Sequence, residues 1–204
     1  MIRLFTISVL AFFMACSNGN NNSLSDEGEM VPLLPADAQL EPLNDGSGLV
    51  KATVYAGERI IEQGYYLNGY RVGVYTTFFP KNEFVESMTG YVNGKKQGQS
   101  TLLDDRGQVQ EVFTYNNDVL HGQYIKFNRT RLKEKKDYVN GMLEGKVEKF
   151  YANGKIMERS LYKAGKLHGV SRWYDQQGKN TIASEYNMNE HVKDVALEPA
   201  PTPR

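Results

Sequence analysis

Two histidines occupy the same place in a repeated Leu-His-Gly sequence, and matched histidines of this kind are candidates for a metal site. They are His121 and His168, about two repeats of the chain apart. In a stack of hairpins, strands spaced by about 4.8 Å would separate the two residues by roughly 19 Å. A zinc ion bonded at about 2 Å cannot bridge that gap, and His191 has no cysteine or carboxylate at a useful spacing. We therefore expect neither a metal nor a cofactor.

Glutamates recurring about every 24 residues form a second chemically interesting group. The shared repeat position holds Glu62, Ser87, Glu111, Glu134, Glu158 and Ile182. Paired carboxylates hydrolyse glycosides when they flank a cleft and one of them has a raised pKa, and an acidic ladder can also bind cations. The simpler interpretation is that each carboxylate pairs with a base across its hairpin, such as Lys126, Lys149 or Arg172. We favour pairing, and we predict no catalytic residue and no enzymatic activity.

A basic segment, Arg-Thr-Arg-Leu-Lys-Glu-Lys-Lys, spans residues 129–136. Its charges alternate between the two faces of a strand, so they cannot form one continuous patch. We interpret the segment as a solvated edge of the third and fourth repeats. The functional alternative is contact with an anionic lipid or a surface polysaccharide. We expect no nucleic-acid partner.

The single cysteine, Cys16, follows an apolar run that begins after Arg3. This run is too short to span a bilayer, which needs roughly 20 apolar residues, but it fits an export signal over residues 1–15. The sequence Phe13-Met14-Ala15-Cys16 is similar to the lipobox of bacterial lipoproteins. We predict lipidation of Cys16 and an exported protein anchored in the bacterial envelope, in the outer membrane. Cleavage after Ser17 would instead give a secreted protein without lipid.

One sequence pattern, Tyr-x-Asn-Gly-x-x-x-Gly, dominates the rest of the chain. Its tyrosines are Tyr66, Tyr91, Tyr115, Tyr138, Tyr162 and, in a divergent last unit, Tyr186. The first glycine is kept at Gly69, Gly94, Gly141 and Gly165, and the last at Gly73, Gly98, Gly122, Gly145 and Gly169. The tyrosines lie 23 to 25 residues apart, and such a fixed period is typical of repeat architectures.

Turn chemistry predicts what each repeat forms. Asn-Gly pairs favour the type I′ turn of a two-residue hairpin, because both central residues need positive φ. Further turns are indicated at Gly107, Gly154 and Gly178, with aromatic residues between the two sets of turns. A single hairpin is marginal in water, so neighbouring hairpins must stack. We predict an all-β fold: a single-layer antiparallel array of about six hairpin repeats, with twelve strands and a divergent sixth unit as the cap.

Charge and composition divide the chain into parts. Residues 16–49 contain acidic but no basic residues, whereas residues 50–193 contain 22 Lys and Arg against 16 Asp and Glu. We predict a disordered acidic tether over 16–49, a repeat domain over 50–193 and a disordered Pro-rich tail over 194–204.

The tyrosine-glycine pattern resembles the MORN repeat, in the variant found in bacterial proteins of the YwqK antitoxin type. The resemblance covers residues 50–193 and implies an interaction module for membrane contact, protein assembly or scaffolding. It leads us to expect a non-enzymatic envelope lipoprotein whose repeats bind an envelope protein or a surface polymer. The alternative is an immunity or antitoxin protein that neutralises a toxin. A third hypothesis, a glycan hydrolase, would depend on Glu111 or Glu134.

Overall fold

Antiparallel strands make up all the regular secondary structure of residues 34–197, the part of the chain that the computed structural model describes. The strands are β1 (Gln39–Pro42), β2 (Val50–Ala56), β3 (Arg59–Leu67), β4 (Tyr70–Phe78), β5 (Val85–Val92), β6 (Lys95–Leu103), β7 (Val109–Asn116), β8 (Val119–Leu120), β9 (Gly122–Asn128), β10 (Arg131–Val139), β11 (Met142–Phe150), β12 (Ile156–Lys163), β13 (Lys166–Leu167), β14 (Gly169–Tyr174), β15 (Asn180–Asn187) and β16 (Glu190–Asp194). The predicted signal segment and Cys16 lie outside the described residues.

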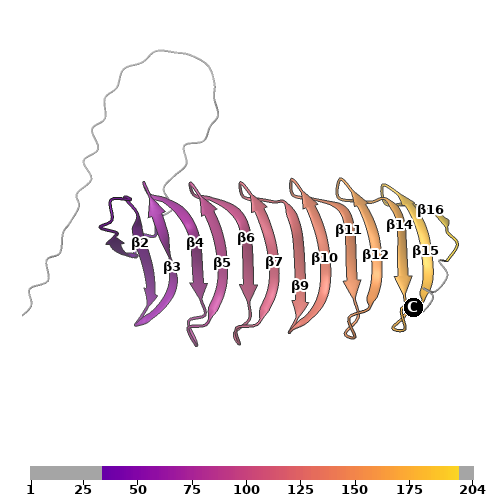
Figure 1. Ribbon diagram of the computed structural model, residues 1–204, viewed down its shortest axis with the longest axis horizontal. Coiled ribbons are helices and arrows are strands. Elements are labelled where there is room, and N and C mark those ends of the chain that lie inside the picture. The colour runs from indigo at the N-terminus through magenta and orange to yellow at the C-terminus, as the bar shows by residue number, and fades with distance from the viewer. Residues whose placement is uncertain (1–33, 198–204) are drawn as a thin grey trace, which may run out of the picture. The chain divides into compact units, whose positions relative to one another are not determined.

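The strands form one open sheet in which they follow one another in sequence order, with the short β8 and β13 pairing only with β7 and β12 (Figure 1). The prediction of a single-layer antiparallel hairpin array is confirmed. The twelve predicted strands become fourteen elements because two of them are interrupted at His121 and His168, which separate β8 from β9 and β13 from β14. Two further strands, β1 and β2, precede the first hairpin.

Tight turns with two left-handed residues close all six hairpins at one edge of the sheet. At the Asn-Gly turns the φ values are 52° and 82° for Asn68 and Gly69, and 50° and 80° for Asn140 and Gly141. The divergent sixth turn keeps this geometry, with 51° at Met188 and 80° at Asn189. The hairpin therefore persists without an Asn-Gly pair, and Asn189 and Leu167 bond its turn to the preceding hairpin.

Residues assigned to the tether in the sequence are part of this sheet. Strand β1 pairs with β2, and Ala38 packs against a cluster of buried residues that includes Ala52 and Tyr66. The prediction of disorder is therefore wrong for residues 39–42, and also for Asp194 of the predicted tail, which belongs to β16. The physical reason is that β2 would otherwise present an unpaired backbone edge, and β1, which carries Glu41 and Pro42, covers it with a short and poorly extendable strand.

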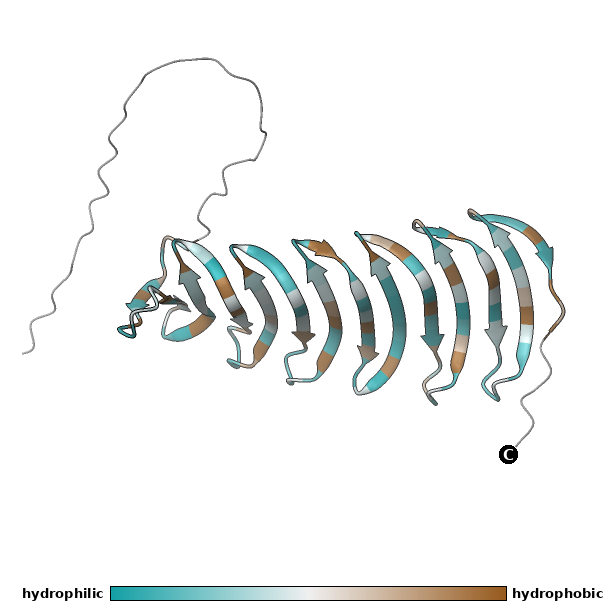
Figure 2. Ribbon diagram, turned by 45° about the horizontal axis from the view of Figure 1, so that its top comes forward, coloured by the Kyte–Doolittle hydropathy of each residue, from teal (hydrophilic) through white to brown (hydrophobic). Residues whose placement is uncertain are grey.

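The sheet has no second layer, and its burial comes from rows of side chains that run across the strands. Apolar residues form short bands along the bowed strands rather than one continuous core (Figure 2). We call the side that carries the motif tyrosines the tyrosine face. A central row crosses this face, one residue per strand, and consists of Gly64, Tyr75, Thr89, Ser100, Phe113, Tyr124, Lys136, Val147, Ser160, Ser171 and Ser184. Its small residues are the most deeply buried, with Ser100, Ser160 and Ser171 exposed by 2% or less.

Candidate functional site

The last glycine of each motif pairs with the tyrosine of the following repeat. The pairs are Gly73 with Tyr91, Gly98 with Tyr115, Gly122 with Tyr138, Gly145 with Tyr162, and Gly169 with Tyr186. All five glycines are left-handed, with φ between 71° and 94°. The registers of β3–β4, β5–β6 and β10–β11 shift beside three of them, which is the geometry of a β-bulge that bends a strand. The motif thus fixes strand curvature and tyrosine packing, and it is structural.

The turn edge is held together by a second repeating interaction. The amide nitrogen of the second turn residue donates to a carbonyl of the preceding hairpin, as from Gly94 to Arg71 at 2.9 Å and from Gly165 to Leu143 at 2.9 Å. The side chain just before the last glycine reaches the first residue of the next turn in three repeats. His121 is one of these, and its Nδ1 accepts from the amide of Asn140 at 3.4 Å. This use of His121 is structural and explains its position.

The glutamates of the row all have local partners, but only Glu111 pairs with a base across its own hairpin, as predicted. Lys126 pairs with Glu111 at 2.5 Å and Lys149 with Glu158 at 2.8 Å. Glu134 pairs with Lys136, two residues along its own strand, at 2.9 Å.

The first glutamate of the row, Glu62, instead accepts a hydrogen bond from the Tyr75 hydroxyl at 2.7 Å. Burial, and then this hydrogen bond, raises the pKa of Tyr75. The four glutamates of the row are therefore all engaged by neighbouring side chains, and Glu158 also accepts a bond from Ser160 at 2.9 Å.

Arg71 joins the three most buried tyrosines of the tyrosine face. Its Nε donates to the Tyr66 hydroxyl at 3.1 Å, and its guanidinium carbon lies 4.0 Å from the centroid of the Tyr75 ring and 5.4 Å from that of Tyr91. The three tyrosine side chains leave this cation only partly exposed to solvent. Arg71 therefore belongs to the packing of the first two repeats rather than to an open binding surface.

A different environment surrounds the basic segment at the opposite edge. Pairing of β10 with β11 starts at Glu134 and Lys149, so the first three residues of β10 diverge from the end of β11. The gap is a hollow of about 570 Å³, lined by Asn128, Arg129, Thr130, Arg131, Leu132, Lys133, Phe150, Tyr151 and Ala152. We call it the basic hollow, because its lining includes three cations and no carboxylate. A second hollow of about 360 Å³ shares Arg131 and Tyr151 with it and extends to Gln176.

Hydrogen bonds bridge the same gap in other hairpins. In the first, Arg59 Nη1 donates to the carbonyls of Pro80 at 2.6 Å and Lys81 at 2.8 Å. In the fifth, Lys155 Nζ donates to the Gln177 carbonyl at 2.7 Å. Arg131 occupies the corresponding position of the fourth hairpin.

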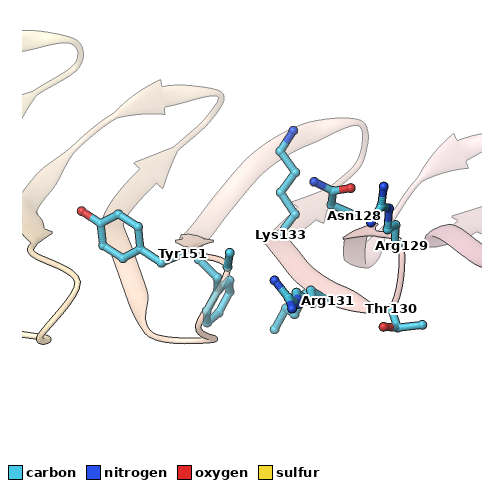
Figure 3. A pocket seen from close by; sticks show the side chains of 9 residues that line it. Asn128, Arg129, Thr130, Arg131, Lys133 and Tyr151 are labelled. Carbon is cyan, nitrogen blue, oxygen red and sulfur yellow. The ribbon is translucent and has the colours of Figure 1, made fainter.

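The cations of the basic hollow have no such partners. Within residues 34–197, the side chains of Arg129, Arg131 and Lys133 form no hydrogen bond or ion pair. Tyr151 stands across the hollow on the neighbouring turn, and its hydroxyl donates to the Tyr174 carbonyl at 2.7 Å, which fixes the ring (Figure 3). The basic hollow therefore offers three free cations beside a positioned aromatic ring, a combination suited to an anionic ligand.

Sequence analysis located the basic segment but did not predict the hollow. The signal that was available is the length of the turn at residues 129 and 130, which lacks the glycine-containing loop found at Gly107, Gly154 and Gly178. Arg129 takes a left-handed φ of 57° in this short turn. Whether the adjoining strand ends close or diverge depends on bonds between turns, which no local pattern records.

Comparison with known proteins adds no assignment: neither a family model nor a curated protein matches this chain. Among residues 34–197 there is no helix long and apolar enough to cross a membrane.

Proposed function

We propose that the chain is a non-enzymatic lipoprotein of the bacterial envelope, and that its MORN-like repeats present a binding surface to an envelope protein or a surface polymer. The lipid on Cys16 would hold the array at the membrane. The observation that carries this proposal is the contrast between acidic and basic side chains. The glutamates that could act as acid or base are engaged in pairs, whereas the cations of the basic hollow are free.

Pairing matters because a general acid needs a carboxyl group with a raised pKa next to a substrate cleft. The glutamates of the row are instead held by neighbouring lysine, serine or tyrosine side chains. Free cations on an open sheet, in contrast, are ready to bind anions without first breaking an internal ion pair.

The anchor is tested by expressing the full chain and its Cys16→Ser variant in a diderm bacterium. We expect the wild-type chain to incorporate a palmitate analogue, to have an intact mass that includes lipid, and to sediment with membranes. The variant should lose all three properties. An unlipidated mature chain that starts at Asn18 would contradict the anchor.

Binding is tested by incubating the purified array with envelope fractions that have been treated either with protease or with periodate, which destroys glycans. Retention should be lost after one treatment and not after the other, which identifies the class of partner. Release of soluble sugars from a glycan panel, abolished by Glu111→Gln or Glu134→Gln, would contradict a non-enzymatic role.

A further inference from the structure

We infer that the basic hollow binds the carboxylate-bearing sugar units of an acidic polysaccharide. This inference rests on the proposed binding function and names the ligand class and its site. Arg131 lies at a position of the repeat that also holds a cation in the first and fifth hairpins. In the first and fifth hairpins the equivalent cation satisfies carbonyls of the next turn, and in the fourth it does not. An uncommitted guanidinium at a place where the fold elsewhere uses the charge internally is available for a carboxylate, which it can bind through two parallel hydrogen bonds.

Arg129 adopts an unfavourable backbone conformation. Its φ of 57° lies in the left-handed region, where a glycine is favoured and a side chain is costly. An arginine nevertheless occupies this position, and it places a second guanidinium at the rim of the basic hollow.

The shape of the site favours an oligomer as its ligand. The two adjoining hollows run from Arg129 past Tyr151 to Gln176, across two hairpins, or roughly 19 Å at 4.8 Å per strand. This length suits an extended oligomer rather than a single ion. The fixed Tyr151 ring offers an apolar surface to the C–H face of a sugar, and the Asn128 amide and the Thr130 hydroxyl offer hydrogen bonds to sugar hydroxyls.

The direction of the cations argues against a flat membrane as the ligand. Figure 3 shows Lys133 and Arg131 leaving β10 in different directions, so the charges do not lie in one plane. A lipid surface would be contacted best by coplanar cations. A polymer that threads between the diverging strand ends can meet both.

The experiment measures binding of the full chain to tetragalacturonate by titration calorimetry at low salt. We expect binding that weakens as salt is added, and none to the methyl-esterified form, which keeps the sugar rings and loses the charges. Hexaglutamate and phosphatidylglycerol vesicles are tested in parallel. Equal or stronger binding to either one, or no binding to tetragalacturonate, overturns the inference.

Substitutions then locate the site. Arg131→Gln and Lys133→Gln should each lower the affinity roughly threefold, and together about tenfold, as expected for partly exposed charge pairs. The matched control is Lys163→Gln with Lys166→Gln, which removes two exposed cations from the opposite edge. An equal loss in the control would show that only net charge matters, and it would overturn the assignment to the basic hollow.

Arg129→Gly separates binding from folding. Removing the left-handed side chain should raise Tm, by up to roughly 2–4 °C, while the affinity falls about threefold. Ala164→Gly relieves the same conformation in a turn at the other edge, where φ is 49°, and should raise Tm with unchanged affinity. If Arg129→Gly binds as the wild type does, the inference fails.

Two further outcomes distinguish failure of the proposed binding function from failure of the site. If the array still retains envelope polymer after Arg131→Gln and Lys133→Gln, the proposed binding function stands and the basic hollow is not its site. If it retains neither envelope protein nor polymer in any form, the proposed function itself fails.

Discussion

Both ends of the central row are buried, but one end is filled by a large aromatic ring and the other by small serine side chains. Near the N-terminus the Tyr75 ring fills the row beside Gly64, where a Cβ would lie 2.2 Å from the ring. Near the C-terminus the row consists of Ser160, Ser171 and Ser184, all at most 5% exposed. A one-layer sheet can therefore bury its centre either with a ring opposite a glycine or with small side chains under their neighbours. Only the first arrangement buries much apolar surface, so we expect stability to be concentrated in the first two repeats.

The largest effect should come from Tyr66→Ala. Tyr66 is 1% exposed, its ring lies 6.2 Å from that of Tyr75, and Arg71 donates to its hydroxyl. Removing the ring leaves a cavity and should lower the free energy of unfolding by about 3–5 kcal/mol, as for other buried aromatic residues. The equivalent change at half-buried Tyr162 should cost clearly less. Equal losses in urea unfolding would refute the difference between the two ends.

Gly64→Ala tests the ring-beside-glycine arrangement directly. The added methyl group collides with the Tyr75 ring and should cost about 1–3 kcal/mol in urea unfolding. In a Tyr75→Ser background, which imitates the row of the later repeats, the same alanine should be tolerated. The interaction energy from this double-mutant cycle measures the collision, and additive losses would contradict it.

Substitutions at the serine end of the central row should change stability less, and with different signs at Ser171 and Ser160. The Ser171 hydroxyl is buried and has no hydrogen-bond partner among the described residues, whereas the Ser160 hydroxyl donates to Glu158. Ser171→Ala should leave stability unchanged or raise it by about 1 kcal/mol, because an unsatisfied polar group is removed. Ser160→Ala should cost about 1 kcal/mol because a bond is lost. Denaturant unfolding of the two variants compares neighbours of nearly equal burial, and the same sign in both would contradict this account.

The smallest expected effect is acid opening of the last hairpin. Hydrogen bonds from the Ser184 hydroxyl at 2.8 Å and from His191 lower the pKa of Asp194 below 3.8. A carboxyl group with a lowered folded-state pKa stabilises the fold above its unfolded value of 3.8, and this contribution disappears as the pH falls through the folded pKa. The protection factors of the β16 amides, which correct for the slower intrinsic exchange in acid, should therefore fall below about pH 4. Asp194→Asn should remove that pH dependence, and its persistence in the variant would assign the effect elsewhere.

Much of the fold was accessible from local sequence because hairpin repeats are built from local contacts. The spacing of Tyr66 and its counterparts indicated the period, and the Asn-Gly pairs indicated where the chain reverses. The pairing of Glu111 with Lys126 was also predictable, because the two residues stand directly opposite each other within one hairpin. The partner of Glu158 was less predictable, because Lys149 faces Glu134 within its own hairpin and pairs with Glu158 of the next repeat.

The role of the motif glycines and the start of the folded region were not predictable in the same way. Gly73 matters because it faces Tyr91 of the next repeat, which is a relation between repeats. Strand β1 forms because β2 has an open edge, although the composition of residues 39–42 indicates no strand by itself. The basic segment could be found in the sequence, but the free state of Arg131 depends on the bonds that neighbouring turns make.

The sequence by itself determined the repeat, its period and the turn at one edge, because these follow from the backbone preferences of glycine and asparagine and from strand alternation. The tertiary structure decided which equivalent residues are used internally and which are left free. Arg59 and Arg131 occupy the same place in the repeat, and only the first has carbonyls within reach. The physical reason is that a cation is satisfied by the geometry of the adjacent turn, and that geometry exists only once the hairpins are stacked.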